Sequence, residues 1–202
     1  METVLRGRTG TEVIISPERP TVIIGERINP GGGGRKKLTA ALAAMDMQLV
    51  RQEALRQVAA GAAVIDVNVQ AADVLGREPE TLVAAVEAVA AVVDVPISVD
   101  TNDRNALPAG LKSAPGRPLV NSVTGEEASL ERVLPLVAEY HACVIVMPAD
   151  DDGIPTADPY RRLEIARKIL LRAEKYGIPP EDILMDCITL PEIGRASCRE
   201  RV

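Results

Sequence analysis

Residues 96–102 read PISVDTN, and this stretch decides the fold. Pro96 opens a short apolar run, which ends abruptly in the carboxylate of Asp100, the hydroxyl of Thr101 and the amide of Asn102. A short apolar run bounded by proline and polar residues is typical of a buried strand in a parallel sheet that is covered on both faces. In α/β folds, ligands bind at the carboxyl ends of such strands. The sequence therefore places Asp100 where chemistry is expected.

The rest of the chain repeats this pattern. Short apolar runs predict five further strands, at residues 21–25, 63–69, 118–121, 142–147 and 183–186. Helical patterns separate them, at residues 36–60 with a break near Asp46, from Pro79 onward, at 103–113, at 127–140 and from Pro159 onward. This alternation predicts right-handed crossovers and hence a parallel sheet. Two alternating segments around Thr9 and Gly10 predict a short N-terminal β-hairpin.

Polar residues close nearly every predicted strand of the sheet, namely Asn29, Asn68, Asp100, Asn121 and Asp186. A TIM-type (β/α)8 barrel gathers all strand ends around one mouth, whereas an open doubly wound sheet spreads them along an edge, so the barrel is favoured. A barrel needs eight strands. We therefore expect residues 1–191 to be an incomplete barrel domain, truncated after about strand six. The arginine-rich tail at residues 192–202 has no structural pattern, and we expect it to be a vector or assembly scar.

Composition argues against several classes of function. The net charge of −6 and the absence of a basic cluster argue against a nucleic-acid groove. No apolar run approaches the ~18 residues that cross a bilayer. Three cysteines without CxxC spacing favour reduced thiols in the cytoplasm over disulfides or a zinc site, and no metal ligands are predicted. We expect Cys143 and Cys187 to be core residues rather than nucleophiles.

Three polar residues are expected to converge at the mouth of the barrel, because Asp100, Asn121 and Asp186 each end a strand. Two carboxylates and an amide suit a flat heterocycle with several N–H donors, and a pterin presents an amino group and a ring N–H that one carboxylate can accept together. Each residue taken alone could instead be a cap of a neighbouring helix. Asp66 and Asn68 share a face and either line the same mouth or only hold its loops.

Five motifs resemble, in order, those of the pterin-binding methyltransferases, a family that includes methyltetrahydrofolate:corrinoid methyltransferases and the folate domain of cobalamin-dependent methionine synthase. They are GERINP (25–30), AGAAVIDVNV (60–69), PISVDTN (96–102), NSVTGE (121–126) and ILMDCITLP (183–191). Dihydropteroate synthases are related to this family. The resemblance implies that Asp100, Asn121 and Asp186 bind the pterin ring. Further motif residues are expected to line the site, namely Glu26, Arg27, Asn29, Asp66, Asn68 and Asn102. In the family an Asn after strand seven contacts N5, and because this chain lacks that segment no catalytic residue is assigned.

The function implied by the resemblance is methyl transfer from N5 of methyltetrahydrofolate to the cobalt of a corrinoid (cobalamin), which a partner protein or domain supplies. GERINP and DVNVQAAD replace the two substrate loops of the synthases, although Gln70 departs from the small residue usual after DVNV. Two alternatives stay open, a dihydropteroate synthase-type condensation and a non-catalytic pterin-binding module. We expect this chain alone to lack turnover. Its oligomeric state is open, with a homodimer among the options.

Overall fold

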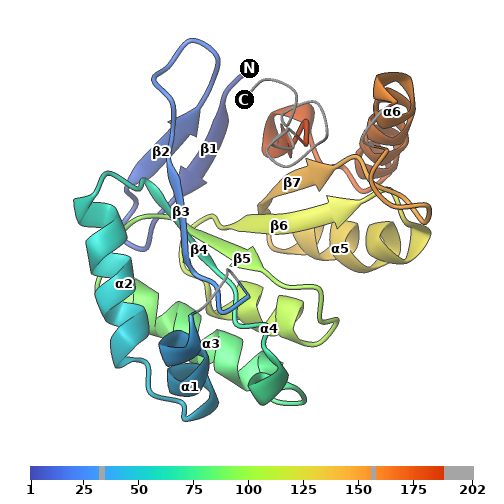
Figure 1. Ribbon diagram of the computed structural model, residues 1–202. Helices are drawn as coiled ribbons and strands as arrows, with labels where there is room; N and C mark the ends of the chain where they lie inside the picture. The colour runs from blue at the N-terminus through green and yellow to red at the C-terminus, as the bar shows by residue number, and fades with distance from the viewer. Residues whose placement is uncertain (32–34, 156–157, 189–202) are drawn as a thin grey trace, which may run out of the picture.

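The chain forms a short hairpin followed by a parallel sheet with helices packed around it (Figure 1). The computed structural model describes residues 1–31, 35–155 and 158–188. The tail at residues 192–202, interpreted above as a scar, lies outside the described residues. In the hairpin, β1 (Thr3–Arg6) pairs antiparallel with β2 (Glu12–Ile15).

The main sheet has six parallel strands, and neighbouring strands follow the order of the chain. They are β3 (Ile24–Ile28), β4 (Val64–Val67), β5 (Ile97–Asp100), β6 (Leu119–Thr124), β7 (Cys143–Met147) and β8 (Ile183–Met185). A doubly wound sheet reverses its strand order at a switch point, and this sheet does not. A sequential parallel order is the arrangement of a barrel wall, and it brings all the carboxyl ends to one edge.

The first strand of this sheet lies further along the chain than the apolar pattern predicts. A strand over residues 21–25 was expected to end at Gly25, but β3 begins at Ile24 and continues through Glu26 and Arg27. The register with β4 shifts after Gly25, and the Arg27 amide donates to Oε1 of Gln57 at 2.8 Å. A side-chain acceptor here replaces a backbone partner, so the polar end of the strand remains satisfied. An apolar pattern carries no signal for such a bond.

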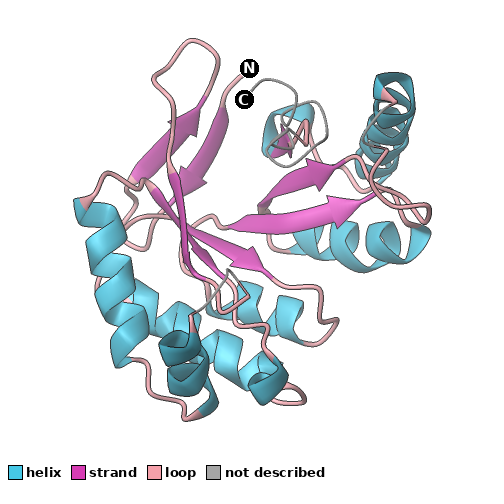
Figure 2. Cartoon of the chain, viewed as in Figure 1, coloured by secondary structure: helices cyan, strands magenta, loops and turns pink. Residues whose placement is uncertain are grey.

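Helices cover the outer face of the sheet (Figure 2). They are α1 (Lys36–Ala43), α2 (Gln48–Ala59), α3 (Glu78–Ala90), α4 (Ala106–Ser113), α5 (Glu127–Glu139) and α6 (Pro159–Lys175). The predicted break near Asp46 separates α1 from α2, and Asp46 Oδ1 accepts from the Gln48 amide at 3.0 Å. Leu82, Val86 and Val89 of α3 are fully buried against the sheet. Each such side chain contributes about 1.5–3 kcal/mol by burial.

The hairpin packs against the amino-terminal end of the sheet. Leu5 of β1 is buried with Val64, Leu119 and Cys143, which are the first residues of their strands. Burial raises the pKa of the Cys143 thiol to about 12, as suits a core residue. The same expectation is wrong for Cys187, which is exposed because it follows the end of β8. Among the described residues, no helix combines the length and apolar character needed to span a membrane.

Candidate active site

The carboxyl ends of β5 to β8 surround a pocket of about 590 Å³. Four of the residues predicted from the sequence line it, namely Asp100, Asn102, Asn121 and Asp186. Asp100 ends β5, Asn121 lies in β6 and Asp186 directly follows β8. The parallel order of the strands therefore brings together side chains that are far apart in the sequence. The volume is in the range of small-molecule sites.

Hydrogen bonds join the polar side chains of β4, β5 and β6 behind this lining. In the sheet register Asp66 lies opposite Ser98, and Asp100 lies opposite Asn121. Oδ1 of Asp66 accepts from Ser98 Oγ at 2.5 Å and from Asn121 Nδ2 at 3.2 Å. Nδ2 of Asn68 donates to Oδ2 of Asp100 at 2.8 Å. Asp66 and Asn68 therefore do not line the pocket. Asp66 is hydrogen-bonded to Asn121 and Asn68 to Asp100, and these two partners line it.

Two carboxyl groups of this network hold protons more tightly than usual. Burial raises the pKa of Asp66 from 3.8 to about 7, and the neighbouring charge of Asp100 adds to the shift. Asp66 is 1% exposed, and its Oδ2 has no hydrogen-bond partner within the described part of the chain. Burial also raises the pKa of Asp100, while the hydrogen bond from Asn68 opposes that rise. A carboxyl group with a pKa near neutrality can gain or lose a proton at working pH.

Asp186 is exposed at the end of β8. Its backbone amide donates to the Val146 carbonyl at 2.9 Å, which extends the pairing of β8 with β7 by one residue. Its Oδ1 accepts from the Ile188 amide at 2.7 Å and so turns the following chain. A carboxylate accepts several hydrogen bonds, so Asp186 retains capacity for donors of a ligand. Within residues 1–31, 35–155 and 158–188, no three His, Cys, Asp or Glu side chains are grouped as metal ligands would be.

Three other predicted site residues do not line the pocket. The Arg27 guanidinium pairs with the Glu53 carboxylate of α2 at 3.4 Å, on the outer side of the sheet. Asn29 Oδ1 accepts from the Gly31 amide at 2.9 Å and holds a turn. Glu26 is exposed, although its charge is near enough to raise the pKa of both buried carboxyl groups. Because β3 extends further than predicted, these residues belong to the strand and its turn instead of a loop over the pocket.

The pocket also contains polar residues that the sequence reasoning missed. Six of them are Ser122, Thr124, Glu126, Ser129, Arg132 and Asp150. The first two were missed because β6 was predicted to end at Asn121, whereas it continues to Thr124. Glu126, Ser129 and Arg132 are spaced three apart across the start of α5, which places them on one helix face. That spacing was a usable signal for a polar face turned to the pocket.

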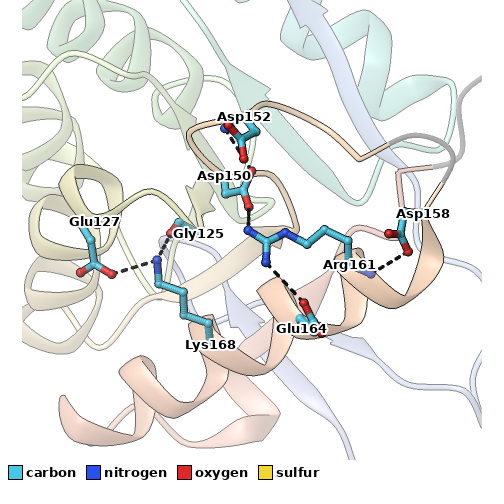
Figure 3. A network of polar contacts seen from close by, with 8 residues as sticks. All are labelled: Gly125, Glu127, Asp150, Asp152, Asp158, Arg161, Glu164 and Lys168. Carbon is cyan, nitrogen blue, oxygen red and sulfur yellow. Dashed lines mark hydrogen bonds and ion pairs between the residues drawn. The ribbon is translucent and has the colours of Figure 1, made fainter.

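Helix α6 holds the two loops that form one wall of the pocket (Figure 3). Nζ of Lys168 donates to the Gly125 carbonyl at 2.6 Å and pairs with Glu127 at 2.8 Å, after β6. Arg161 pairs with Asp150 at 2.6 Å, after β7. The Gly125 amide also donates to the Ala149 carbonyl at 2.7 Å, so the two loops contact each other directly. The shape of this wall therefore depends on where α6 sits.

Two methionine synthases are similar to this chain in sequence. The protein from Mycobacterium leprae is 31% identical over 180 residues, which cover 85% of this chain and 14% of that protein. The protein from Mycobacterium tuberculosis is 28% identical over 186 residues, covering 89% of this chain and 15% of that protein. The chain therefore spans a small part of the length of these relatives.

Solved dihydropteroate synthases have a similar fold. The Xanthomonas albilineans enzyme gives a TM-score of 0.62 at 20% identity, over 95% of this chain and 66% of that chain. The Yersinia pestis enzyme, solved with a pterine-sulfa conjugate, gives a TM-score of 0.62 at 24% identity, over 92% of this chain and 64% of that chain. The profile of the family described as "Pterin binding enzyme" matches residues 34–197. Since this match covers most of the sequence, the chain belongs to the pterin binding enzyme family.

Proposed function

We propose that this chain binds methyltetrahydrofolate and takes part in transfer of its N5-methyl group to the cobalt of a corrinoid. The observation that carries the proposal is the polar constellation of Asp100, Asn121 and Asp186 around one pocket. The similarity to two methionine synthases favours methyl transfer among the reactions of pterins. The six strands are, on this proposal, part of the wall of a TIM-type (β/α)8 barrel.

The pterin ring is held by acceptors of this chain. Asp100 and Asp186 accept hydrogen bonds from the amino and ring N–H groups, and Asn121 can both donate and accept at the ring edge. The residues fit such a ring because two carboxylates and an amide line one pocket of sufficient volume. Asn68 and Asp66 hold Asp100 and Asn121 in place through the hydrogen bonds behind the lining.

The reaction requires positive character at N5, because a tertiary amine is a poor leaving group. In this transfer the electron pair of the N5–methyl bond would stay on N5, which would gain a proton, and the methyl group would pass to the acceptor. A corrinoid, held by a partner protein or a cobalamin-binding domain, supplies the nucleophilic metal when bound. Asp66, with a pKa of about 7, keeps a titratable proton in the network that contacts Asn121. The protonation state of Asp66 determines whether a negative charge lies next to Asn121.

The test has a binding arm and a turnover arm. Calorimetric titration should detect methyltetrahydrofolate binding, and a radiolabelled methyl group should pass to a reduced corrinoid in a version extended to the eight strands of the proposed barrel. Weaker binding by Asp100→Asn together with retained folding would support the assigned pocket. An extended protein that binds methyltetrahydrofolate but never transfers the label would contradict methyl transfer.

A second candidate is the condensation catalysed by dihydropteroate synthases, which join a pterin pyrophosphate to p-aminobenzoate. The similarity of fold to solved dihydropteroate synthases favours it. The same extended protein, given a pterin pyrophosphate and p-aminobenzoate, separates the two reactions. Formation of dihydropteroate without methyl transfer would select this candidate, and pterin binding with neither activity would select the non-catalytic module.

A further inference from the structure

The pocket continues past the three strand-end acceptors toward helix α5. This part is lined by Thr124 at the end of β6, by Glu126, Ser129 and Arg132 at the start of α5, and by Ile154 in the loop after β7. We call these five residues the α5 subsite. A pocket of about 590 Å³ can hold a drug-sized ligand, which is larger than a bicyclic ring. A pterin ring at the ends of β5, β6 and β8 therefore leaves the α5 subsite open to a ligand of its own.

The two hydroxyl groups of the α5 subsite have unused hydrogen-bonding capacity. Oγ1 of Thr124 is buried and has no hydrogen-bond partner among the described residues. Ser129 is 3% exposed, and its Oγ accepts from the Thr124 amide at 3.0 Å. Within residues 1–31, 35–155 and 158–188, neither hydroxyl donates a hydrogen bond to the protein. Buried polar groups are normally satisfied, so an acceptor supplied by a ligand is favoured at this point.

The α5 subsite also contains one positive and one negative side chain that are not paired. Arg132 is the only cation among the described residues that line the pocket. Neither Arg132 nor Glu126 forms an ion pair within the part of the chain that the structure describes. The nearby carboxylate of Asp150 differs, because Arg161 engages it at 2.6 Å (Figure 3). A ligand with both charges is attracted by both unpaired side chains, whereas a ligand with one charge is repelled by one of them.

An apolar side chain lies beside these polar groups. Ile154 is 40% exposed and lines the pocket. The turn that precedes Ile154 is closed by two backbone hydrogen bonds between Asp150 and Gly153, at 3.1 and 2.8 Å. This turn is tied to α6 through Arg161, so Ile154 is held at a fixed place in the wall (Figure 3). An aliphatic group that covers Ile154 removes apolar surface from water, which favours binding.

We propose that the α5 subsite binds an α-amino acid with an aliphatic side chain. The carboxylate of the ligand accepts hydrogen bonds from Thr124 and Ser129 and pairs with Arg132. Its ammonium group donates to the Glu126 carboxylate, and its side chain packs on Ile154. The inference goes beyond the proposed function and is independent of it, because no residue of the α5 subsite is one of the three pterin acceptors.

The test compares L-leucine with two analogues that each lack one charged group. 4-Methylpentanoate keeps the carboxylate and the side chain, and 3-methylbutylamine keeps the ammonium group and the side chain. We expect L-leucine to bind the 202-residue chain in a ligand-observed NMR titration. Each analogue should bind roughly tenfold more weakly, because one charged hydrogen-bonding group of the subsite then has no partner. No folate is present in these titrations, so their outcome does not depend on the proposed function.

Two variants assign the two charged contacts separately. Arg132→Gln should weaken L-leucine binding and abolish its preference over 3-methylbutylamine. Glu126→Gln should abolish the preference over 4-methylpentanoate. A variant that merely fails to fold loses all binding, so these two distinct changes in selectivity report the contacts themselves. The matched controls are Arg104→Gln and Glu131→Gln, which remove exposed charges outside the pocket lining and should leave L-leucine affinity unchanged.

Several outcomes of these titrations would overturn the inference. Absence of L-leucine binding to the unmodified chain is one, and equal affinity for L-leucine and both analogues is another. Selectivity that stays unchanged in both Arg132→Gln and Glu126→Gln would also exclude the α5 subsite as the place of binding. An equal loss of affinity in the two control variants would do the same, because it would show a general effect of charge.

Discussion

At the scale of single residues, the site combines buried carboxyl groups with few compensating cations. Asp66 illustrates the consequence, since it is 1% exposed and has one oxygen without a partner among the described residues. Burying a charge in this way is costly, so the group favours its neutral form. The sequence predicts that Asp66 lies in a strand, but the protonation of Asp66 depends on its burial and on the neighbouring charge of Asp100.

The first prediction is that Asp66→Asn flattens the dependence of stability on pH. The folded pKa is about 7, against 3.8 for the ordinary group. Below pH 4 both states are protonated; between pH 4 and pH 7 only the folded state keeps the proton, so stability falls as pH rises, by about 4 kcal/mol in all. Urea unfolding from pH 4 to pH 8 should show this fall in the unmodified chain and lose most of it in the variant.

A matched control for this experiment is Asp94→Asn. Hydrogen bonds from Thr9 and Thr11 lower the pKa of Asp94 to about 2, so its effect has the opposite sign. Its contribution is present above the ordinary pKa and is lost as pH falls toward 2. The control should therefore destabilise the chain at neutral pH and keep the fall between pH 4 and pH 7. A fall that persists unchanged in Asp66→Asn would remove Asp66 as its source.

The second prediction concerns ligand affinity. Asp100→Asn and Asp186→Asn each preserve the side-chain volume but remove a charged acceptor for the pterin, so affinity for methyltetrahydrofolate should fall by about 1–3 kcal/mol. Calorimetric titration measures the change. Asp73→Asn is a control at a carboxylate outside the pocket lining. Unchanged affinity in both site variants would exclude these two residues from the binding site.

At the scale of elements, α6 positions the loops that form one wall of the pocket. Its N-terminus is capped by Asp158, whose Oδ1 accepts from the amides of Tyr160 at 3.0 Å and Arg161 at 2.9 Å. Pro159 occupies the first helical position, where its missing N–H costs no hydrogen bond. The sequence predicts both features. The contacts of Lys168 and Arg161 with the loops after β6 and β7 appear only in the folded chain.

The third prediction is that Asp158→Ala lowers the free energy of unfolding by about 1 kcal/mol, because two amides at the start of α6 lose their acceptor. Asp158→Asn retains an acceptor oxygen at the same position, so it should lower the free energy of unfolding by only a small fraction of that amount. Thermal unfolding of the two variants side by side gives the difference. Equal losses in both would show that the cap contributes through charge and not through the hydrogen bonds.

The fourth prediction concerns the contact between Gly125 and α6. A Cβ at this position would lie 2.5 Å from Ile165 Cγ2 and 2.9 Å from the Ala149 carbonyl oxygen. Gly125→Ala should therefore displace α6 or the loop after β7, and lower stability by about 1–3 kcal/mol. Folate affinity should fall with it, because Ala149 lines the pocket. Ala128→Ser, at an exposed position of α5, is the control, and a Gly125→Ala variant as stable as that control would contradict the contact.

At the scale of the whole molecule, the described sheet is open. Strands β3 and β8 each pair with one neighbour, so both present unpaired backbone groups. Some apolar side chains of α6 and β8 are exposed, namely Leu163 at 48% and Leu171 at 62% on α6 and Met185 at 38% on β8. Apolar area that stays in water loses a burial free energy of ~25 cal/mol per Å². This loss is large relative to the net stability of a domain, which is only ~5–15 kcal/mol.

The fifth prediction is that the 202-residue chain self-associates as its concentration rises. Open strand edges and exposed leucines supply the contacts, because a strand edge pairs with any other unpaired edge. Light scattering across a concentration series measures the effect. Leu171→Lys places a charge on the exposed face of α6 and should reduce it, whereas Lys175→Gln on the same helix should not. A monomer at every concentration, with a cooperative unfolding transition, would contradict the prediction.

The sequence by itself determined the alternation of strands and helices, the N-terminal cap of α6 and the placement of Asp100 and Asp186 at strand ends, whereas Asn121 lies inside β6, which continues to Thr124. These features follow from local periodicity and from residues whose backbone preferences are strong, such as Pro159. Tertiary structure alone decided the end of β3, where Gln57 accepts a hydrogen bond from Arg27, and hence the exclusion of Glu26, Arg27 and Asn29 from the pocket lining. It also decided the pKa of Asp66, because the burial that raises this pKa depends on neighbours that are distant in the chain.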